Sequence, residues 1–362
     1  MVNPDSDLYR EHPEYAVGHP TKKPVKGRNQ LVLDLCQKAV RDYIVDQVGA
    51  ILDEAKVSYV KWDMNRHIGE GYSIALKRQG EFYHRYILGL YEVLSRIFRD
   101  RPGILLESCS SGGNRFDLGM LCFSPQIWSS DNTDPIARLR IQTGLSYFYP
   151  LSTMGAHVSQ SPHQQTLRAT PLSTRFNVAC FGCLGYELAL KHLTEQIAFY
   201  KQYRRVFQYG TFSRLKAEKE NKVIWQCVNQ NKTMALAGLF QTLANAAEGD
   251  ERLSVKGLDA GVYSMRTRPQ RLHLARFGGL LKHVSPVELN PDGFLLRQAN
   301  RHYSLADCVE AYQCSAAALS FGIPLHNQFT GTGYNENIRM LGDFGSNLYI
   351  IEQLNVEGEN DE

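Results

Sequence analysis

Residues 57–63, Val-Ser-Tyr-Val-Lys-Trp-Asp, are the stretch that decides the fold. The stretch is rich in β-branched and aromatic residues, which favour a strand. It stands between residues 37–55 and 81–99, where apolar side chains recur every three or four positions as in amphipathic helices. A strand between two helices indicates a parallel sheet covered by helices. The strand ends on Asp63, at the carboxyl end where such sheets carry their sites.

The alternation of strands and helices continues to about residue 207. We expect strands at residues 29–35, 103–108, 126–131 and 149–155, and helices at 135–147, 171–183 and 194–207. Polar residues gather where these strands end, which is typical of a (β/α)8, or TIM, barrel. A closed barrel needs eight strand–helix units, and only five or six can be counted. The expected fold is therefore α/β, with a partial barrel.

The pattern changes after residue 208. Residues 222–228 and 233–240 are strand-like and are joined by the turn sequence Asn-Gln-Asn-Lys, and residues 342–353 end in another strand. We predict a C-terminal antiparallel β-sandwich domain, in which residues 267–312 are less regular and leave room for helices. The predicted domains are a barrel domain at 1–207, incomplete at its N-terminal side, a β-rich domain at 208–355, and an acidic tail at 356–362 that we expect to be disordered.

The composition is that of an ordinary soluble globular protein. Of 362 residues, 43% are hydrophobic and 21% are charged, which excludes a mainly disordered chain. The 40 basic and 37 acidic residues leave a net charge of only +3, so no nucleic-acid or membrane partner is expected. No apolar run reaches about 18 residues, and the polar N-terminus shows no signal-peptide core. With 8 scattered cysteines, the simplest location is the cytoplasm.

The strongest chemical signal is Lys61-Trp62-Asp63-Met64-Asn65-Arg66. Side chains alternate along a strand, so residues 61, 63 and 65 point to one side. A cation beside Asp63 keeps this carboxylate ionised, and a fixed ionised carboxylate is what a glycosidase nucleophile requires. The alternative is a surface ion pair at the end of a strand.

A second acid follows in Ser130-Asp131-Asn132-Thr133-Asp134-Pro135. Asp134 precedes a proline and then a helix, so we assign it to the helix N-cap. Asp131 ends a strand, has Trp128 nearby, and has no basic residue within five positions on either side. That environment favours the neutral acid and suits a general acid. Glycoside hydrolysis requires two carboxyl groups whose environments shift their pKa values in opposite directions.

The third signal is the glycine-rich segment 107–115, Glu-Ser-Cys-Ser-Ser-Gly-Gly-Asn-Arg. Glycine lets a ligand approach the backbone closely, so this loop could bind a phosphate or sugar hydroxyls. It lacks the Lys-Ser/Thr of a phosphate-binding loop, and a tight turn with no ligand remains open. A nucleophilic role for Cys109 lacks a neighbouring histidine.

Two further sequence features, a histidine and a cysteine pair, allow either a functional or a structural role. His157 follows a strand and could line a site, but a structural histidine fits equally well. Cys180 and Cys183 form a lone CxxC in an apolar stretch, which favours buried apolar packing over a zinc or redox site.

Together these segments resemble the α-galactosidases of glycoside hydrolase family 36, of the intracellular bacterial kind. The resemblance rests on PDSDLY at 4–9, GRNQLVLDL at 27–35, YVKWDMNR at 59–66, ESCSSGGNRFDLGM at 107–120, PQIWSSDNTD at 125–134, YPLSTMGAHVS at 149–159, residues 170–188 and QYGTF at 208–212. It extends more loosely to residue 351, and therefore covers nearly the whole chain.

The resemblance implies roles for individual residues. Asp63 matches the family's catalytic nucleophile and Asp131 its acid/base. Six residues match positions that line the galactose pocket: Arg28, Lys61, Asn65, Cys109, Gly112 and Trp128. The implied reaction is hydrolysis of terminal α-galactosides, such as melibiose and raffinose, with retention and without a metal or other cofactor. Family members are often homo-oligomers.

The resemblance also implies parts that this chain lacks. Family members carry an N-terminal β-sandwich before the barrel and are roughly twice as long. Here Met1 matches a point well inside the barrel. We therefore expect the first barrel strands and their share of the galactose pocket to be missing. The alternatives are a non-catalytic fragment that supports assembly or sugar binding, and an activity on α-N-acetylgalactosaminides or in galactosyl transfer.

Overall fold

The structure is a computed structural model, and it describes residues 1–188, 193–219, 221–245, 251–272, 290, 293–302, 304–307, 309–325 and 341–354. The chain divides into two compact units, Met1–Asp131 and Asn132–Glu362, and each is considered by itself. Within the described ranges, no helix combines the length and the apolar character that a membrane crossing requires.

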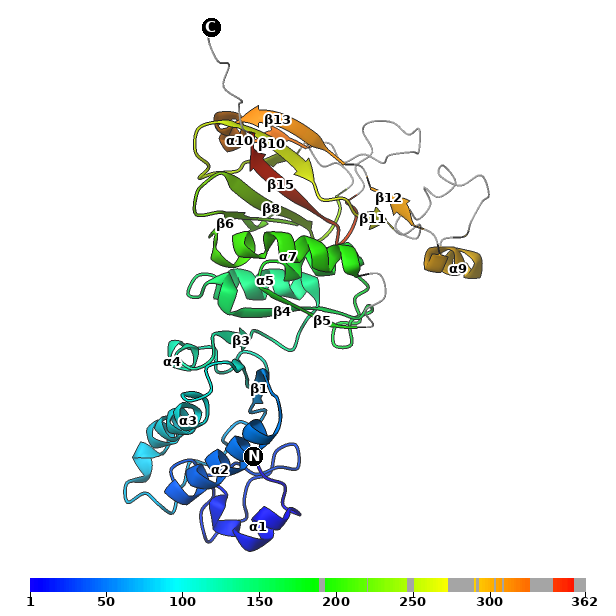
Figure 1. Ribbon diagram of the computed structural model, residues 1–362. Helices are drawn as coiled ribbons and strands as arrows, with labels where there is room; N and C mark the ends of the chain where they lie inside the picture. Colours follow the sequence, from blue (N-terminus) through cyan, green and yellow to red (C-terminus); the bar gives the residue numbers. More distant parts are fainter. Residues whose placement is uncertain are drawn as a thin grey trace. The chain divides into compact units, whose positions relative to one another are not determined.

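The first unit contains three parallel strands that pair in chain order. These strands are β1 (Tyr59–Asp63), β2 (Leu105–Cys109) and β3 (Gln126–Trp128). The helices are α1 (Asp7–Glu11), α2 (Lys38–Glu54), α3 (Phe82–Phe98) and α4 (Leu118–Leu121), with 3-10 turns at Pro13–Tyr15 and Gln79–Glu81. The long helices α2 and α3 lie side by side (Figure 1).

The core of this unit decides which way the β1 side chains point. Leu52 of α2 and Val93 and Ile97 of α3 are buried together, and Val60 and Trp62 of β1 pack against them. Because neighbouring side chains on a strand point to opposite faces, Lys61 and Asp63 are left on the other face of the sheet. Both are exposed. The face predicted for residues 61 and 63 is confirmed.

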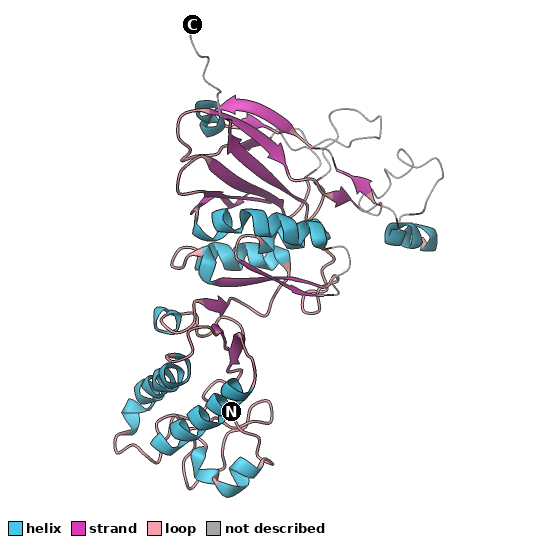
Figure 2. Cartoon of the chain, viewed as in Figure 1, coloured by secondary structure: helices cyan, strands magenta, loops and turns pink. Residues whose placement is uncertain are grey.

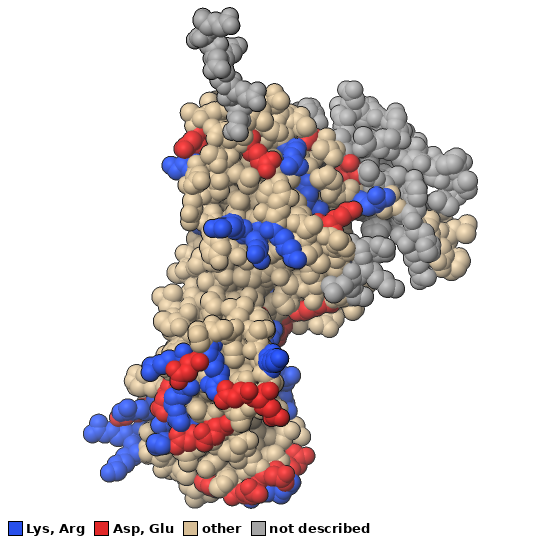
Figure 3. Space-filling view, in the orientation of Figure 1, with Lys and Arg blue, Asp and Glu red and all other residues tan. Residues whose placement is uncertain are grey.

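Basic and acidic side chains are interspersed over this first unit (Figure 3). Several of them form ion pairs on α2, on α3 and just after α3: Lys38 with Asp42, Arg96 with Asp42 and Glu92, and Arg101 with Asp53. Such exposed pairs contribute little to stability, about 0–1 kcal/mol each. The pairs match the near-balanced charge of the whole sequence.

The second unit begins with the other parallel pair, β4 (Met154–Ser159) and β5 (Cys183–Glu187). Its helices are α5 (Pro135–Leu145), α6 (Leu172–Ala179) and α7 (Thr194–Tyr209), and a 3-10 turn lies at Leu151–Thr153. Helices α5 and α7 lie between this pair and a large antiparallel sheet (Figure 1).

The antiparallel sheet has six strands in the order β13-β10-β15-β8-β7-β6. They are β6 (Thr211–Lys219), β7 (Lys222–Val228), β8 (Met234–Gln241), β10 (Val262–Thr267), β13 (Ala311–Ser315) and β15 (Ser346–Gln353). Two short pairs join β9 (Arg252–Leu253) to β14 (Ile323–Pro324) and β11 (Arg271–Leu272) to β12 (Leu305–Ala306). Figure 2 shows this sheet with α9 (Phe294–His302) and α10 (Ala316–Phe321).

An aromatic cluster joins the helices to the sheet. Phe181 is fully buried and contacts the rings of Phe207, Phe212, Trp225 and Phe240 at centroid distances of 5.0–6.1 Å. These rings come from α7, β6, β7 and β8, so one side chain contacts four elements. Edge-to-face aromatic packing of this kind adds to the free energy gained by burying the rings.

The predicted fold class is confirmed by the parallel strands in both units and by the antiparallel sheet that follows. Four local predictions are wrong. The strand predicted at 126–131 ends at Trp128, so Asp131 follows it by three residues. Residues 29–35 form only isolated bridges, from Gln30 to Gly27, from Leu31 to Val2 and from Leu33 to Ala16. The strand predicted at 149–155 begins instead at Met154, after a 3-10 turn. The helix predicted at 171–183 ends at Ala179, and β5 follows it.

Two predictions fall partly or wholly outside the described residues. In the segment 267–312, the helix α9 confirms that helical structure is present, but much of the rest is not described. The acidic tail at 356–362 lies outside the described residues. The predicted domain boundaries at 207 and 355 stay predictions.

Candidate active site

Asp63 is the last residue of β1, and its carboxylate is held by a neighbouring amide. The Nδ2 of Asn65 donates a hydrogen bond to Oδ2 of Asp63. The Oδ1 of Asn65 accepts a hydrogen bond from the backbone N–H of Ser111, at 2.8 Å. Asn65 therefore connects the carboxylate to the glycine-rich loop after β2. The structure brings Asp63 and Asn65 together, as expected if both belong to one site.

Cys109 lies directly opposite Asp63 in the parallel register of β1 and β2. Burial raises the pKa of the Cys109 thiol to about 11, a backbone hydrogen bond to Gly112 opposes this, and the hydrogen-bonded Asp63 carboxylate raises it further. The side chain is therefore a neutral thiol near pH 7. A neutral thiol can shape a pocket, but it is a poor nucleophile.

Lys61 interacts with a buried acid that the sequence-based assignments did not include. Its Nζ lies 3.2 Å from Oε1 of Glu107, whose side chain is 2% exposed, and 4.5 Å from the centroid of the Trp128 ring. Among the described residues, no ion pair joins Lys61 to Asp63. The parallel register places Glu107 opposite Lys61, and the expectation that a cation beside Asp63 keeps this carboxylate ionised stays a prediction.

Glu107 is the centre of a small polar cluster on β1, β2 and β3. The hydroxyl of Tyr59 and the Nε2 of Gln126 both donate hydrogen bonds to its Oε2, the latter at 2.8 Å. Sequence reasoning missed Glu107 as a site residue. The available signal was an acid inside the otherwise apolar strand Gly-Ile-Leu-Leu-Glu-Ser, because a buried carboxylate needs a partner.

Asp131 follows β3 and is exposed, while its supporting residues are buried. The indole Nε1 of Trp128 donates a hydrogen bond to Oδ1 of Asp131, at 2.9 Å. Gly112 lies close to the backbone of the same residue, since a Cβ built on it would stand 3.2 Å from the Asp131 nitrogen. Gly112 also has φ +84°, a conformation that favours glycine.

One loop therefore contacts the surroundings of both acids. Its Ser111 N–H binds the amide that holds Asp63, and its Gly112 lies against the backbone of Asp131. The loop itself is fixed by Ser110, whose hydroxyl donates to the Met64 carbonyl at 2.9 Å. Two carboxylates whose surroundings contact one loop, the first at the end of β1 and the second shortly after β3, can perform acid/base and nucleophilic chemistry.

Arg28 is exposed and lies in a tight turn with φ 52°. The turn is closed by paired backbone hydrogen bonds between Gly27 and Gln30, at 2.9 and 3.1 Å. The structure places this turn in the first unit with Asp63 and Asp131, but among the described residues no hydrogen bond or ion pair joins Arg28 to either acid.

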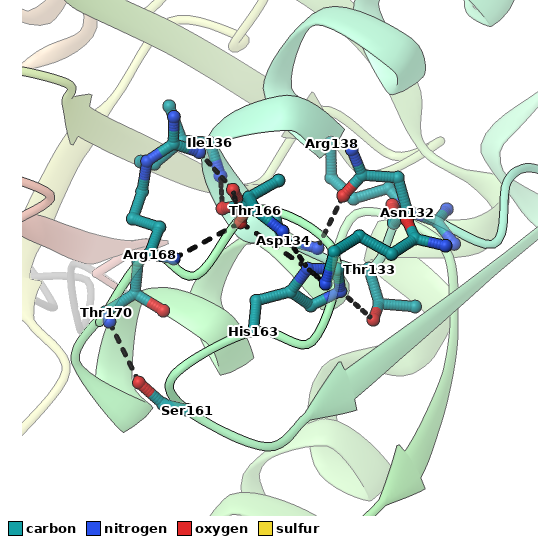
Figure 4. A network of polar contacts seen from close by, with 11 residues as sticks. Asn132, Thr133, Asp134, Ile136, Arg138, Ser161, His163, Thr166, Arg168 and Thr170 are labelled. Atoms are coloured by element: carbon teal, nitrogen blue, oxygen red, sulfur yellow. Dashed lines mark hydrogen bonds and ion pairs between the residues drawn. The ribbon is translucent and has the colours of Figure 1, made fainter.

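Asp134 is a structural acid, as predicted. It caps α5 by accepting from the Ile136 N–H at 3.0 Å, and Pro135 follows at the first helical position. It is fully buried, pairs with Arg168 and accepts from the Thr166 hydroxyl at 2.8 Å. Figure 4 shows this network.

His163 completes the network in Figure 4. Its Nδ1 accepts backbone N–H groups from the segment 165–166, so its Nε2 carries the hydrogen that faces the Thr133 hydroxyl at 3.0 Å. The network joins the start of α5 to the segment 161–170. It is a buried structural element of the second unit.

The two ambiguous sequence features lie in the second unit, and the role of His157 stays open. Nδ1 of His157 on β4 lies 2.8 Å from Oε1 of Glu187 on β5. Cys180 is fully buried, and the half-buried Cys183 donates to the Ser152 carbonyl at 3.0 Å. Among the described residues, no group of three or more His, Cys, Asp and Glu side chains is placed to hold a metal ion.

Parallel strands followed by two carboxylates, which an indole, an amide and a glycine-rich loop support, are the arrangement of a partial (β/α)8 barrel with a candidate site at its strand ends. The comparisons with known proteins give the particular family. Residues 1–210 match the Melibiase family, and residues 222–351 match the Glycosyl hydrolase family 36 C-terminal domain. This chain belongs to the melibiases of glycoside hydrolase family 36.

Curated relatives of this chain are α-galactosidases. Alpha-galactosidase AgaA of Geobacillus stearothermophilus is 48% identical over 271 residues, which are 72% of this chain and 37% of the relative. Alpha-galactosidase 1 of Pediococcus pentosaceus is 46% identical over 270 residues, with the same coverage of 72% and 37%. The match thus spans little more than a third of each of these relatives.

Solved structures show the same fold. A crystal structure of AgaA from Geobacillus stearothermophilus in complex with raffinose aligns with a TM-score of 0.78 and 37% identity, covering 98% of this chain and 43% of that one. The α-galactosidase from Lactobacillus brevis aligns with a TM-score of 0.79 and 33% identity, covering 100% and 44%. These likenesses support the partial barrel followed by an antiparallel sheet domain.

Proposed function

We propose that the enzyme containing this chain is a retaining exo-α-galactosidase, with Asp63 as nucleophile and Asp131 as acid/base. The observation that carries the proposal is the loop after β2, which contacts both the amide that holds Asp63 and the backbone of Asp131. The α-galactosidase names of the relatives and the family match support the same activity.

In the proposed mechanism, one carboxylate oxygen of Asp63 attacks the anomeric carbon of the galactosyl group. Asp131 donates its proton to the leaving oxygen, so the glycosidic bond breaks as the galactosyl–Asp63 ester forms. Asp131 then takes a proton from water, which attacks the same carbon and releases galactose with its original configuration. This route needs the two carboxyl groups about 5–5.5 Å apart.

The surrounding residues would orient the sugar. Lys61, fixed between Glu107 and Trp128, offers an ammonium group for galactose hydroxyls. Cys109 and Gly112 present a small neutral surface, and Arg28 adds a guanidinium. We propose terminal α-galactosides such as melibiose and raffinose as substrates, since AgaA has been crystallised with raffinose and with stachyose.

The replacement of Asp131 by alanine tests the acid/base assignment. A sugar leaving group needs protonation, whereas a nitrophenolate departs unaided, so the first step on a nitrophenyl α-galactoside should survive far better than the first step on raffinose. Added azide should restore turnover, because this anion attacks the anomeric carbon of the galactosyl–Asp63 ester without help from a base, releasing the Asp63 carboxylate and galactosyl azide. Equal losses on both substrates without azide rescue would assign a structural role to Asp131.

The other readings have separate tests. If residues 1–362 only support assembly or sugar binding, the purified chain will bind galactose without turning over melibiose. An activity on α-N-acetylgalactosaminides or in galactosyl transfer would appear in a substrate panel. We also propose a cytoplasmic homo-oligomer with no nucleic-acid or membrane partner, which sedimentation and cell fractionation can check.

A further inference from the structure

Arg66 is a buried cation that the proposed mechanism does not use. It follows Asp63 by three residues and is only 6% exposed. Its guanidinium donates to three backbone carbonyls: Nη2 to Val25, Nη1 to His67, and Nε to Gln30 at 3.4 Å. A buried charge is costly unless it is well satisfied, so these bonds hold the segments on both sides of it together.

The segment that Arg66 holds is the turn that carries Arg28. Arg28 and Asn29 have φ 52° and 58°, so both central residues lie in the left-handed region. Backbone hydrogen bonds in both directions between Gly27 and Gln30 close the turn. A two-residue turn with two such residues is of the I′ kind, where Asn-Gly is favoured and an arginine at the first position is unusual.

The packing of Gly27 shows how closely the guanidinium fits this turn. A Cβ built on Gly27 would stand 2.7 Å from Nε and 2.8 Å from Cζ of Arg66. The absence of a side chain at Gly27 is therefore what lets the guanidinium reach the carbonyl groups of Val25 and Gln30. A lysine could not replace it, because only the planar guanidinium directs several N–H groups at once.

We propose that Arg66 is a positioning residue that fixes the left-handed Arg28 turn to the end of β1, so that the Arg28 guanidinium is presented to the galactosyl group. This inference rests on the proposed function only for the role of Arg28. The mechanical part, that Arg66 holds the turn, stands on the contacts alone.

Hydrogen exchange on the full chain tests the mechanical part. In Arg66→Lys, the amides of the peptide covering residues 25–31 should exchange about tenfold faster or more, because the turn loses its clamp. Adding Asn29→Gly should return the exchange toward wild type, since glycine adopts the left-handed conformation freely. The matched control is Arg41→Lys. The wild-type Arg41 guanidinium donates to the carbonyls of Leu35 and Cys36, in the same unit but outside the turn.

Steady-state kinetics test the catalytic part. Arg66→Lys should raise KM about fivefold or more with a smaller change in kcat, as expected for a lost contact made in both ground and transition states. In an Arg28→Ala background, Arg66→Lys should change KM less than about twofold, because the residue through which it acts is gone.

The outcomes separate the two proposals. If exchange of residues 25–31 in Arg66→Lys matches that in Arg41→Lys, the positioning role is overturned, whatever the activity. If the KM effect persists undiminished in the Arg28→Ala background, Arg66 does not act through Arg28. If the enzyme that contains residues 1–362 does not hydrolyse α-galactosides while the exchange results hold, the proposed function fails but the role of Arg66 in holding the turn remains.

Discussion

Replacing Gly112 with alanine should weaken both stability and catalysis, because this glycine has a conformation and a position that a side chain does not tolerate. Its φ is +84°. An added Cβ would lie 3.2 Å from the Asp131 nitrogen and 3.2 Å from the Ser130 Cα. Both contacts are with backbone atoms, which cannot move away as easily as the end of a flexible side chain.

Two separate effects set the size of the loss. A non-glycine residue in the left-handed region costs roughly 1–2 kcal/mol of stability. The contacts with residues 130 and 131 also require a shift of a few tenths of an ångström at the proposed acid/base. Because a 1 Å displacement of a catalytic group costs on the order of 10²-fold, this smaller shift should lower kcat/KM about fivefold. A fivefold loss corresponds to about 1 kcal/mol of transition-state stabilisation.

Denaturant unfolding and hydrolysis of a nitrophenyl α-galactoside would measure the two effects. Gly103→Ala is the matched control in the same unit, since a Cβ at Gly103 would meet no atom within 4 Å. The same experiment on Gly112→Ala should show lower stability and lower kcat/KM than this control. If the two variants are indistinguishable in both measurements, the loop does not position Asp131.

Three further expectations concern neighbouring residues. Asp134→Ala should destabilise the protein by about 2–4 kcal/mol in denaturant unfolding, since it removes both a helix cap and the buried partner of Arg168. Asp134→Asn keeps a capping oxygen but loses the negative charge, so it should lower stability less than Asp134→Ala does. Equal losses of stability in the two variants would contradict a separate contribution from the helix cap. Glu107→Gln should raise KM about tenfold with little change in kcat, because Lys61 loses its ionic partner; an unchanged KM would show that Lys61 is held by other contacts. The pKa of Cys109, raised to about 11 in the folded protein, lies above that of an unfolded thiol. The unfolded chain therefore loses this proton first as pH rises through about 9 toward 11, and stability should fall over that range; Cys109→Ala should lose less stability there, and equal slopes would contradict the pKa shift.

Long amphipathic segments were predictable to within a residue or two. The helix expected at 81–99 is Phe82–Phe98, since seven of its apolar residues repeat at helical spacing and bury one face. The strand β5 was not predictable, because Cys183–Glu187 is short and continues an apolar run from the preceding helix. Periodicity alone does not separate such a strand from a helix end. Residues 29–35 were predicted as a strand but form isolated bridges in place of a ladder.

The candidate site shows the same limit. The position of Asp63 at the end of β1 and the N-cap role of Asp134 followed from the sequence, whereas Asp131 lies three residues beyond the end of β3. The partner of Lys61 did not follow, because it depends on the register between two strands that are separated by a helix and long loops. A parallel register is set by packing across the whole unit, and no local pattern encodes that Lys61 faces Glu107.

The identity of the nucleophile is the claim on which the account depends most directly. An active preparation containing residues 1–362 can be treated with an activated fluorinated galactoside. This compound forms the covalent ester with the enzyme quickly, and the ester then hydrolyses slowly. Mass spectrometry of the digested protein should then find one fluorogalactosyl adduct, on the peptide that contains Asp63. The variant Asp63→Asn should show neither this adduct nor turnover. An adduct on another residue, or active hydrolysis with inversion and no adduct, would contradict the account.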